Sequence, residues 1–322
     1  MEEKKPIQII LDTDIGWDCD DAGALALIHR LCDKGEAKLL AVTHCYNSPY
    51  CAGCIDAINR FYGCEVPIGI NFAGTERKNP KGVYAGELCE KFPNSYPANS
   101  DDNENGPADT LEVLRKTLAD AEDGSITLVV TGTLTSMARL VMSKADVFSS
   151  LSGKELIAKK VKRTVVMGGR FFESWPMVLY ESGDPTHHMM TWEYNIKGSG
   201  YEDATAVFEN WPGELVLSSY EIGSYIVSMV GYAKRAKVED PVAWAYQVHN
   251  GDTGRPSWDH TAVLEAIRPG TYWNYHEFGQ ISVDEELITH WNRNSDFKHS
   301  YLLPKVDYKE IQQVIDDLID GR

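Results

Sequence analysis

Short apolar runs alternate along the chain with longer segments in which apolar residues recur at helical spacing. The short runs are rich in β-branched residues and predict strands at residues 7–11, 39–43, 66–70, 126–131, 163–167 and 214–218. Helical spacing is found at residues 22–31, 51–62, 109–121, 134–142, 202–209, 221–236, 241–250, 259–267 and 308–319. Because strands and helices alternate, we predict an α/β fold with a largely parallel central sheet and helices on both faces.

Two further segments depart from this alternation. Residues 271–283 predict a β-hairpin, whereas residues 75–107 are rich in Gly, Pro, Asn and Asp and predict a long surface excursion. Such an excursion is either a functional lid or a solvated insertion, and the sequence leaves both open. Since no linker is apparent, residues 1–322 are expected to form a single domain.

Composition narrows the class of partner. The formal net charge of −17 argues against nucleic-acid binding, which depends on Lys and Arg neutralising phosphates. The N-terminal apolar run is too short for a signal peptide and no stretch is long enough to span a membrane, so we expect a cytoplasmic protein with no membrane partner. Seven cysteines without framework spacing fit reduced thiols, and Cys51 and Cys54 are expected to be helical core thiols rather than a zinc or redox pair.

Five aspartates follow the first predicted strand within ten positions: Asp12, Asp14, Asp18, Asp20 and Asp21. Capping of a helix that starts near Asp20 explains one or two of them. The mutual repulsion of five carboxylates is tolerable mainly when a hard cation neutralises it, so we predict a divalent-metal site, with calcium as the ion. The spacing excludes an EF-hand.

Other polar or glycine-rich segments end the next predicted strands. They include Asn47, Thr131-Gly132 and Gly168-Gly169. Ligands of parallel α/β sheets bind beyond the carboxyl ends of the strands, so the active site is expected at that edge.

These segments resemble, in order, the motifs of the nucleoside hydrolases, the inosine-uridine-preferring N-ribohydrolase superfamily. Asp12-Thr-Asp14-Ile-Gly16 followed by Asp20-Asp21-Ala22 is similar to the family signature Asp-x-Asp-x-Gly-x-Asp-Asp-Ala. Further similar segments are Asn47 with Asp56-Ala57, Thr131-Gly-Thr-Leu-Thr135, Met167-Gly-Gly169 and Glu193-Tyr-Asn195. The resemblance implies a Rossmann-like nucleoside hydrolase fold and covers residues 7–267.

The resemblance also implies roles for single residues. Asp14, Asp21, Asp259 and the Thr131 main-chain carbonyl would hold calcium, and Asp14 would take the proton from the attacking water. Ribose hydroxyls would be bound by Asp20, Asn47, Glu193 and Asn195, with His187 where relatives carry a sugar-binding Asn and Asp12 as support. Cleavage of an N-glycosidic bond passes through an oxocarbenium-like sugar, which a carboxylate-rich pocket stabilises.

Three departures from the family pattern bear on the chemistry. Asp18 lies in a two-residue expansion and either shares a role of the paired aspartates or faces solvent. Trp258 stands where many relatives have a histidine acid, which suggests a stacked purine-like leaving group, with Tyr84 as a weak candidate for the opposite wall; a plain core tryptophan is the alternative. His187, His188 or His260 could supply an acid instead, although such residues are more often second-shell or surface groups.

Three functions are therefore compared. The leading prediction is a calcium-dependent enzyme that hydrolyses the N-glycosidic bond of a small-molecule, purine-type ribonucleoside or related ribosyl compound, acting as a homodimer or homotetramer. The alternatives are a ribosyl-ligand-binding protein that lacks turnover and a haloacid-dehalogenase-type phosphatase with Asp12 and Asp14 as nucleophile and acid.

Overall fold

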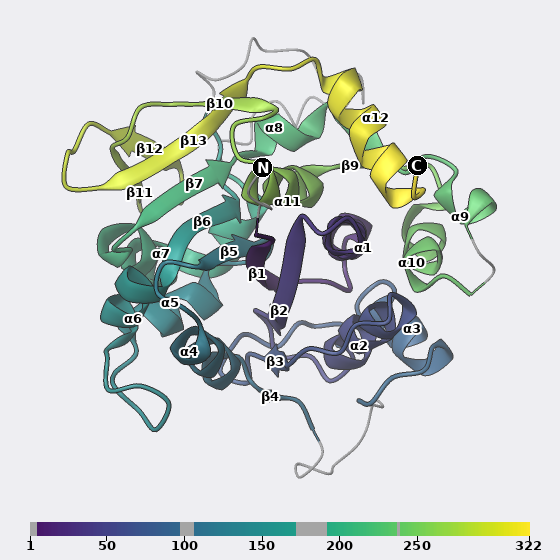
Figure 1. Ribbon diagram of the computed structural model, residues 1–322, viewed down its shortest axis with the longest axis horizontal. Helices are drawn as coiled ribbons and strands as arrows, with labels where there is room; N and C mark the ends of the chain where they lie inside the picture. Colours follow the sequence, from purple (N-terminus) through teal and green to yellow (C-terminus); the bar gives the residue numbers. More distant parts are fainter. Residues whose placement is uncertain (1–4, 97–105, 172–191, 237–238) are drawn as a thin grey trace.

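A nine-stranded sheet forms the centre of the molecule (Figure 1). The computed structural model describes residues 5–96, 106–171, 192–236 and 239–322. The strand order is β10-β13-β7-β6-β5-β1-β2-β3-β4, and every pairing is parallel except that of β10 with β13. The predicted α/β fold class is thereby confirmed. The strands are β1 (Ile7–Thr13), β2 (Ala37–His44), β3 (Ile68–Ile70), β4 (Ala108–Asp109), β5 (Ile126–Val130), β6 (Val161–Met167), β7 (Glu214–Ser218), β10 (Trp273–Tyr275) and β13 (Lys298–Pro304).

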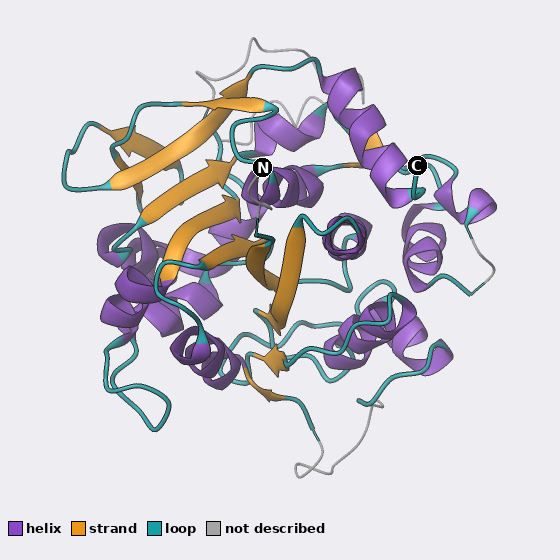
Figure 2. Cartoon of the chain, in the orientation of Figure 1, coloured by secondary structure: helices purple, strands orange, loops and turns teal. Residues whose placement is uncertain are grey.

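Helices cover both faces of this sheet (Figure 2). Successive side chains of a strand point to opposite faces, and β1 accordingly places Ile9 and Leu11 in one core and Ile10 in the other. The first core packs against α1 (Cys19–Asp33), α2 (Cys51–Phe61), α10 (Pro241–Asn250), α11 (Trp258–Ile267) and α12 (Tyr308–Ile319). The second packs against α4 (Thr110–Asp120), α5 (Thr135–Met142), α6 (Gly153–Lys160) and α7 (Tyr194–Asn210).

The segment at residues 271–283 is not the predicted hairpin. Its two strands, β10 and β11 (Gln280–Val283), do not pair with each other. β10 pairs with β13 at the sheet edge, and β11 pairs with β12 (Thr289–Asn292). Alternating apolar residues predicted the strands correctly, but their partners lie further along the chain.

The predicted helix at residues 221–236 is also wrong. The structure has two short helices there, α8 (Tyr220–Ser224) and α9 (Tyr232–Arg235), with strand β8 (Val227–Ser228) between them. Strand β8 pairs with β9 (Arg255–Pro256). Met229 adopts a φ of 60°, which no α-helix accommodates, so helical periodicity here reflects burial on two separate elements.

The predicted excursion at residues 75–107 is partly ordered into helix α3 (Ala85–Lys91). Tyr84 and Leu88 are fully buried, so this part of the segment packs into the first core rather than lying in solvent. Residues 97–105 lie outside the described part of the chain.

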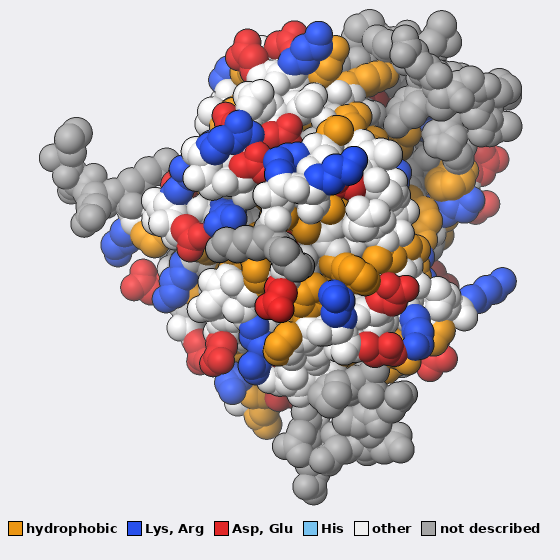
Figure 3. Space-filling view, turned by 90° about the vertical axis from the view of Figure 1, so that its right-hand side faces the viewer, with side chains coloured by type: hydrophobic (Ala, Val, Ile, Leu, Met, Phe, Trp, Pro, Cys, Tyr) orange, Lys and Arg blue, Asp and Glu red, His pale blue; other side chains and the backbone are white. Residues whose placement is uncertain are grey.

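The surface near α9, α10 and α12 mixes acidic, basic and hydrophobic side chains (Figure 3). The acidic excess of the sequence is therefore not concentrated on this face. Among the described residues, no helix is long and apolar enough to cross a membrane.

Candidate active site

The chain leaves β1 through a buried aspartate that joins three strand ends. Asp12 is only 1% exposed, and one of its carboxylate oxygens accepts a 2.6 Å hydrogen bond from the Thr43 hydroxyl of β2. Its main-chain carbonyl accepts a 2.7 Å bond from the amide of Thr131, just beyond β5. Burial raises the pKa of Asp12 to about 7. Asp12 thus joins the carboxyl ends of β1, β2 and β5.

Three further aspartates meet at the first turns of two helices. Asp20 and Asp21 begin α1 and Asp259 begins α11, where the exposed amides of a helix N-terminus favour negative charge. One carboxylate oxygen of each lies within 4.8 Å of the others. The Asp21 carboxylate also accepts from the hydroxyls of Thr13, at 2.5 Å, and Thr131, at 3.1 Å. Burial, reinforced by the neighbouring carboxylates, raises the pKa of all three acids.

This donor set fits a hard divalent cation. Calcium binds oxygen ligands at roughly 2.3–2.6 Å, so oxygens on opposite sides of one ion are separated by about 5 Å. The three aspartate oxygens lie within that span. Their crowding without a cation is electrostatically unfavourable, which the raised pKa values reflect.

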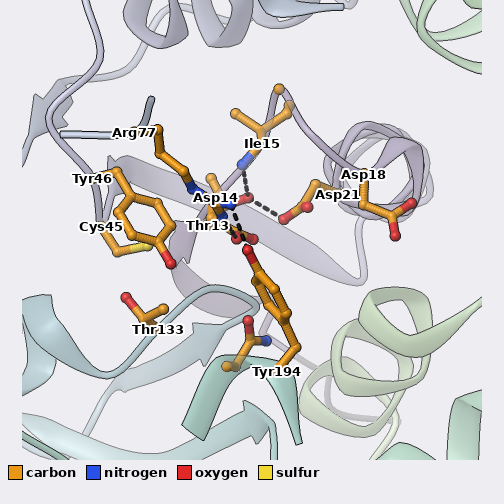
Figure 4. A network of polar contacts seen from close by, with 12 residues as sticks. Thr13, Asp14, Ile15, Asp18, Asp21, Cys45, Tyr46, Arg77, Thr133 and Tyr194 are labelled. Atoms are coloured by element: carbon orange, nitrogen blue, oxygen red, sulfur yellow. Dashed lines mark hydrogen bonds and ion pairs between the residues drawn. The ribbon is translucent and has the colours of Figure 1, made fainter. Parts of the chain in front are cut away.

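Asp14 lies beside this cluster and is paired with an arginine (Figure 4). One nitrogen of Arg77 lies 3.1 Å from the Asp14 carboxylate, and a second donates to the Tyr194 hydroxyl at 2.5 Å. The guanidinium also lies over the rings of Trp17 and Tyr46, at 4.4 and 4.2 Å from their centroids. Burial raises the pKa of Asp14 to about 6 even though Arg77 opposes the shift.

A second polar group faces the aspartates from the start of α7. Glu193 is the N-cap of this helix, and its carboxylate accepts hydrogen bonds from the amides of Asn195 and Ile196 at 2.8 and 3.0 Å. The Asn195 side-chain amide donates to the Thr131 carbonyl at 2.8 Å. Burial raises the pKa of Glu193 to about 7. These bonds fix both side chains before any ligand arrives.

An aromatic wall lies on the α8 and α11 side. Trp258 stacks with Tyr220, with ring centroids 5.4 Å apart and an angle of 29° between the planes. The indole Nε1 donates to the Tyr220 carbonyl at 2.9 Å. Gly223 permits this packing, because a Cβ there would lie 2.4 Å from the Trp258 Cα. Trp258 is therefore held by its neighbours and is not a plain core residue, since it lines the cavity described next.

One cavity of about 470 Å³ unites these groups. That is a suitable size for a small ligand. The predicted residues Asp14, Asp20, Asp21, Thr131, Glu193, Asn195, Trp258 and Asp259 line it together with Asp18. Residues to which the sequence analysis gave no role complete it: Trp17, Arg77, Met167, Arg170, Trp192, Tyr194, Tyr220 and Arg255.

Several other predicted residues lie elsewhere. Asn47 is not among the lining residues and forms an isolated β-bridge with Glu76. Tyr84 is buried, and its hydroxyl donates to the Asp18 carbonyl at 2.7 Å and accepts from the Gly16 amide at 3.0 Å, so it supports the aspartate loop instead of forming a wall. His260 is fully buried outside the cavity lining, with its pKa lowered to about 3 by desolvation. His187 and His188 lie outside the described residues.

The expansion residue Asp18 occupies the N-cap position of α1. Its carboxylate accepts from Arg255 Nε at 2.8 and 3.0 Å and also from Arg255 Nη2. His249 lies 3.6 Å away. Asp18 thus forms an ion pair at the cavity rim. It neither joins the aspartate cluster nor lies free in solvent.

A family model described as inosine-uridine preferring nucleoside hydrolase matches residues 9–310, whereas no curated protein matches the sequence. A nucleoside hydrolase structure from Bacillus anthracis, described as inosine-uridine preferring, is 19% identical, covers 98% of this chain and 100% of its own, and has a TM-score of 0.68. A purine-preferring ribonucleoside hydrolase from Gardnerella vaginalis is 16% identical, with 98% of each chain covered and a TM-score of 0.68. The type III effector protein XopQ, solved with adenosine diphosphate ribose, is 13% identical, covers 99% of this chain and 95% of its own, and has a TM-score of 0.69.

Proposed function

We propose that this chain, which belongs to the inosine-uridine preferring nucleoside hydrolase family, is a calcium-dependent N-ribohydrolase that splits a purine-type ribonucleoside or related ribosyl compound into ribose and free base. The observation that carries the proposal is the gathering of Asp20, Asp21 and Asp259 within 4.8 Å. Asp14 and Glu193 line the same cavity. Family membership supports a hydrolase; the ion and the preferred base are our inference.

Metal binding, proton transfer and sugar binding are assigned to particular residues of the site. Asp14, Asp21, Asp259 and the Thr131 carbonyl would hold calcium, which supplies a Lewis acid that orients the ribose diol and acidifies a bound water. Asp14, which lines the cavity beside the cluster, would take the proton from the attacking water. Asp20, Glu193 and Asn195 would bind ribose hydroxyls, and the buried carboxylates of Asp20 and Glu193 would stabilise the positive charge that develops on the sugar.

The leaving base is placed against the aromatic wall. Trp258 lines the cavity and stands immediately before Asp259, so a base joined to a sugar held at the acids would lie beside the indole. Among the described residues no histidine lines this cavity. Stacking on Trp258 is therefore the means of activation that we propose for the purine.

Release of sugar tests this proposal. The wild-type protein is expected to liberate reducing sugar from inosine with calcium and to stop when a chelator is added. Asp14→Asn is expected to lower turnover by about 10²–10⁴, the usual contribution of a general base. A matched control is Asp252→Asn, because Asp252 is equally buried but caps the Ala233 amide outside the site. Full turnover in Asp14→Asn, or in chelator, would contradict the mechanism.

A second candidate function is ribosyl-ligand binding without turnover. The structural likeness to XopQ, solved with adenosine diphosphate ribose, favours considering it. Binding of adenosine diphosphate ribose by calorimetry, together with absence of sugar release from any nucleoside, would favour this function. The phosphatase alternative does not fit, because its required nucleophile Asp12 is buried below the cavity and bonded to Thr43.

A further inference from the structure

Three arginines line a cavity whose proposed chemistry calls for negative charge. Arg77 pairs with Asp14 and Arg255 with Asp18, and Arg170 lies 3.9 Å from the Glu221 carboxylate. A neutral nucleoside gives a guanidinium little to bind, and a cation near a developing oxocarbenium ion is unfavourable. Carboxylates thus compensate the charges of Arg170 and Arg255, but the place of these side chains on the cavity lining still needs a reason that a neutral substrate does not supply.

Arg170 and Arg255 flank the stacked aromatic pair. Arg170 lies 4.7 Å from the Tyr220 ring centroid, and Arg255 lies 4.9 Å from that of Trp258. Both guanidiniums act on the Tyr220 phenol, where they oppose the burial that raises its pKa. The wall thus carries a cation at each end of a two-ring stack.

The aromatic wall adjoins the acids that are proposed to bind the sugar, which are the aspartate cluster and Glu193. Its Arg255 end leads to Trp258 and then directly to Asp259, one of the clustered acids. Its Arg170 end follows Gly169, whose amide donates to Glu193 at 3.2 Å. A ligand seated between the acids and Glu193 therefore has a guanidinium near either end of the wall.

Arg255 is oriented by the carboxylate of the expansion residue. Asp18 binds Nε and Nη2, and within the described part of the chain no hydrogen bond joins Nη1 to another residue. The Arg255 side chain is 32% exposed and lines the cavity. Asp18 thus presents the guanidinium, with donor capacity left for a ligand, over the face of Trp258.

We propose that Arg170 and Arg255 recognise an anionic group on the substrate, so that the preferred substrate is an anionic ribosyl compound rather than a neutral nucleoside. Guanidinium groups bind phosphate and carboxylate oxygens through paired, charge-assisted hydrogen bonds. The anion is either a phosphate ester on the ribose or an acidic substituent on the base. Asp18 is a positioning residue for Arg255. This inference names the substrate class of the proposed hydrolase and so rests on it.

Paired substrates test the inference. kcat/KM is measured with calcium for inosine against inosine 5′-monophosphate, which places the anion on the sugar, and for uridine against orotidine, which places it on the base. We expect at least one anionic member to exceed its neutral partner about tenfold or more. Arg255→Gln and Arg170→Gln should each reduce that preference severalfold by raising KM for the anionic substrate. Arg255→Lys should retain more of the preference than Arg255→Gln. Asp18→Asn should reduce the preference less than either arginine variant. The matched control is Arg293→Gln, because Arg293 directly follows β12, is 80% exposed and pairs with Glu277 away from the cavity.

Equilibrium binding separates this inference from the hydrolase proposal. Ribose 5-phosphate is compared with ribose, and orotate with uracil, in the wild type and in both arginine variants. Tighter binding of an anion that depends on either arginine, without any sugar release, would support the anion site and defeat the hydrolase. Turnover that is equal for neutral and anionic partners, or a preference that survives both arginine variants, would overturn the anion site and leave the hydrolase standing.

Discussion

Neutralising one acid of the cluster should have opposite effects with and without calcium. The oxygens of Asp20, Asp21 and Asp259 lie within 4.8 Å. At an effective dielectric constant of about 20, two unit charges separated by 4.8 Å repel by roughly 3.5 kcal/mol. Because burial raises the pKa of these acids, protonation relieves part of the repulsion. In chelator, we therefore expect Asp259→Asn to stabilise the protein by about 1–3 kcal/mol.

In calcium, the wild type should instead be more stable than Asp259→Asn. A ligand at a thousand times its dissociation constant stabilises the folded state by about 4 kcal/mol. With an unfolding entropy of roughly 2.1 cal/mol/K per residue over 322 residues, that gain raises Tm by about 6 °C. Asp259→Asn lacks one charged ligand, so most of the calcium-induced rise should be lost.

Thermal unfolding in chelator and in calcium measures both effects. The control is Asp252→Asn, a buried aspartate outside the cluster, which should destabilise the protein equally in the two conditions. An undiminished calcium shift in Asp259→Asn would refute its assignment as a ligand. Destabilisation of that variant in chelator, as large as in the control, would refute the repulsion argument.

Three further predictions follow from single contacts. Trp258→Ala should lower kcat/KM for purine ribosides about tenfold or more while Trp258→Phe retains most of it, because stacking accounts for roughly 1–3 kcal/mol per base; equal losses in steady-state kinetics would contradict this. Burial lowers the pKa of His29 to about 4, so the unfolded state binds a proton that the folded state does not between about pH 6.5 and 4, and stability falls as pH falls through that window. Denaturant titrations of His29→Gln should show a shallower loss than the wild type; an identical pH profile would refute the assignment. Asp146→Asn should cost about 3 kcal/mol because it leaves the buried Arg115 without its 2.6 Å partner. Asp123→Asn, which removes an exposed carboxylate paired with Lys160, should cost much less; equal free energies of unfolding would contradict the difference.

The parallel sheet could be predicted because its strands are buried on both faces. Continuous β-branched runs predict such strands without knowledge of their neighbours, and residues 214–218 coincide with β7. Strand β13, which lies next to the edge strand β10, was missed, since its partners β7 and β10 lie at remote positions and its polar residues, such as His299 and Ser300, hide its pattern. The predicted pairing at residues 271–283 was wrong for the same reason, because periodicity shows which side of a strand is buried but not which strand it pairs with.

The acidic part of the site could be predicted because its residues stand at strand ends or in ordered motifs. Arg77 and Tyr220 had no such signal, since each enters the cavity from a loop or a helix start distant in sequence from β1. Arg77 lies in the excursion at residues 75–107, whose composition suggested a loop but not which side chain would reach Asp14. Charge complementarity at a distance of 63 positions is invisible to local patterns.

The role of Asp18 could not be predicted, because the sequence does not show which residue pairs with it. Taken alone, Asp18 either shared a role of Asp20 and Asp21 or faced solvent. The structure pairs it with Arg255, 237 positions away. Both side chains of this pair are 32% exposed, and an ion pair so accessible contributes about 1 kcal/mol or less to stability. Fold stability therefore does not account for the pair, and its physical effect is to fix a guanidinium over Trp258 at the rim of the cavity.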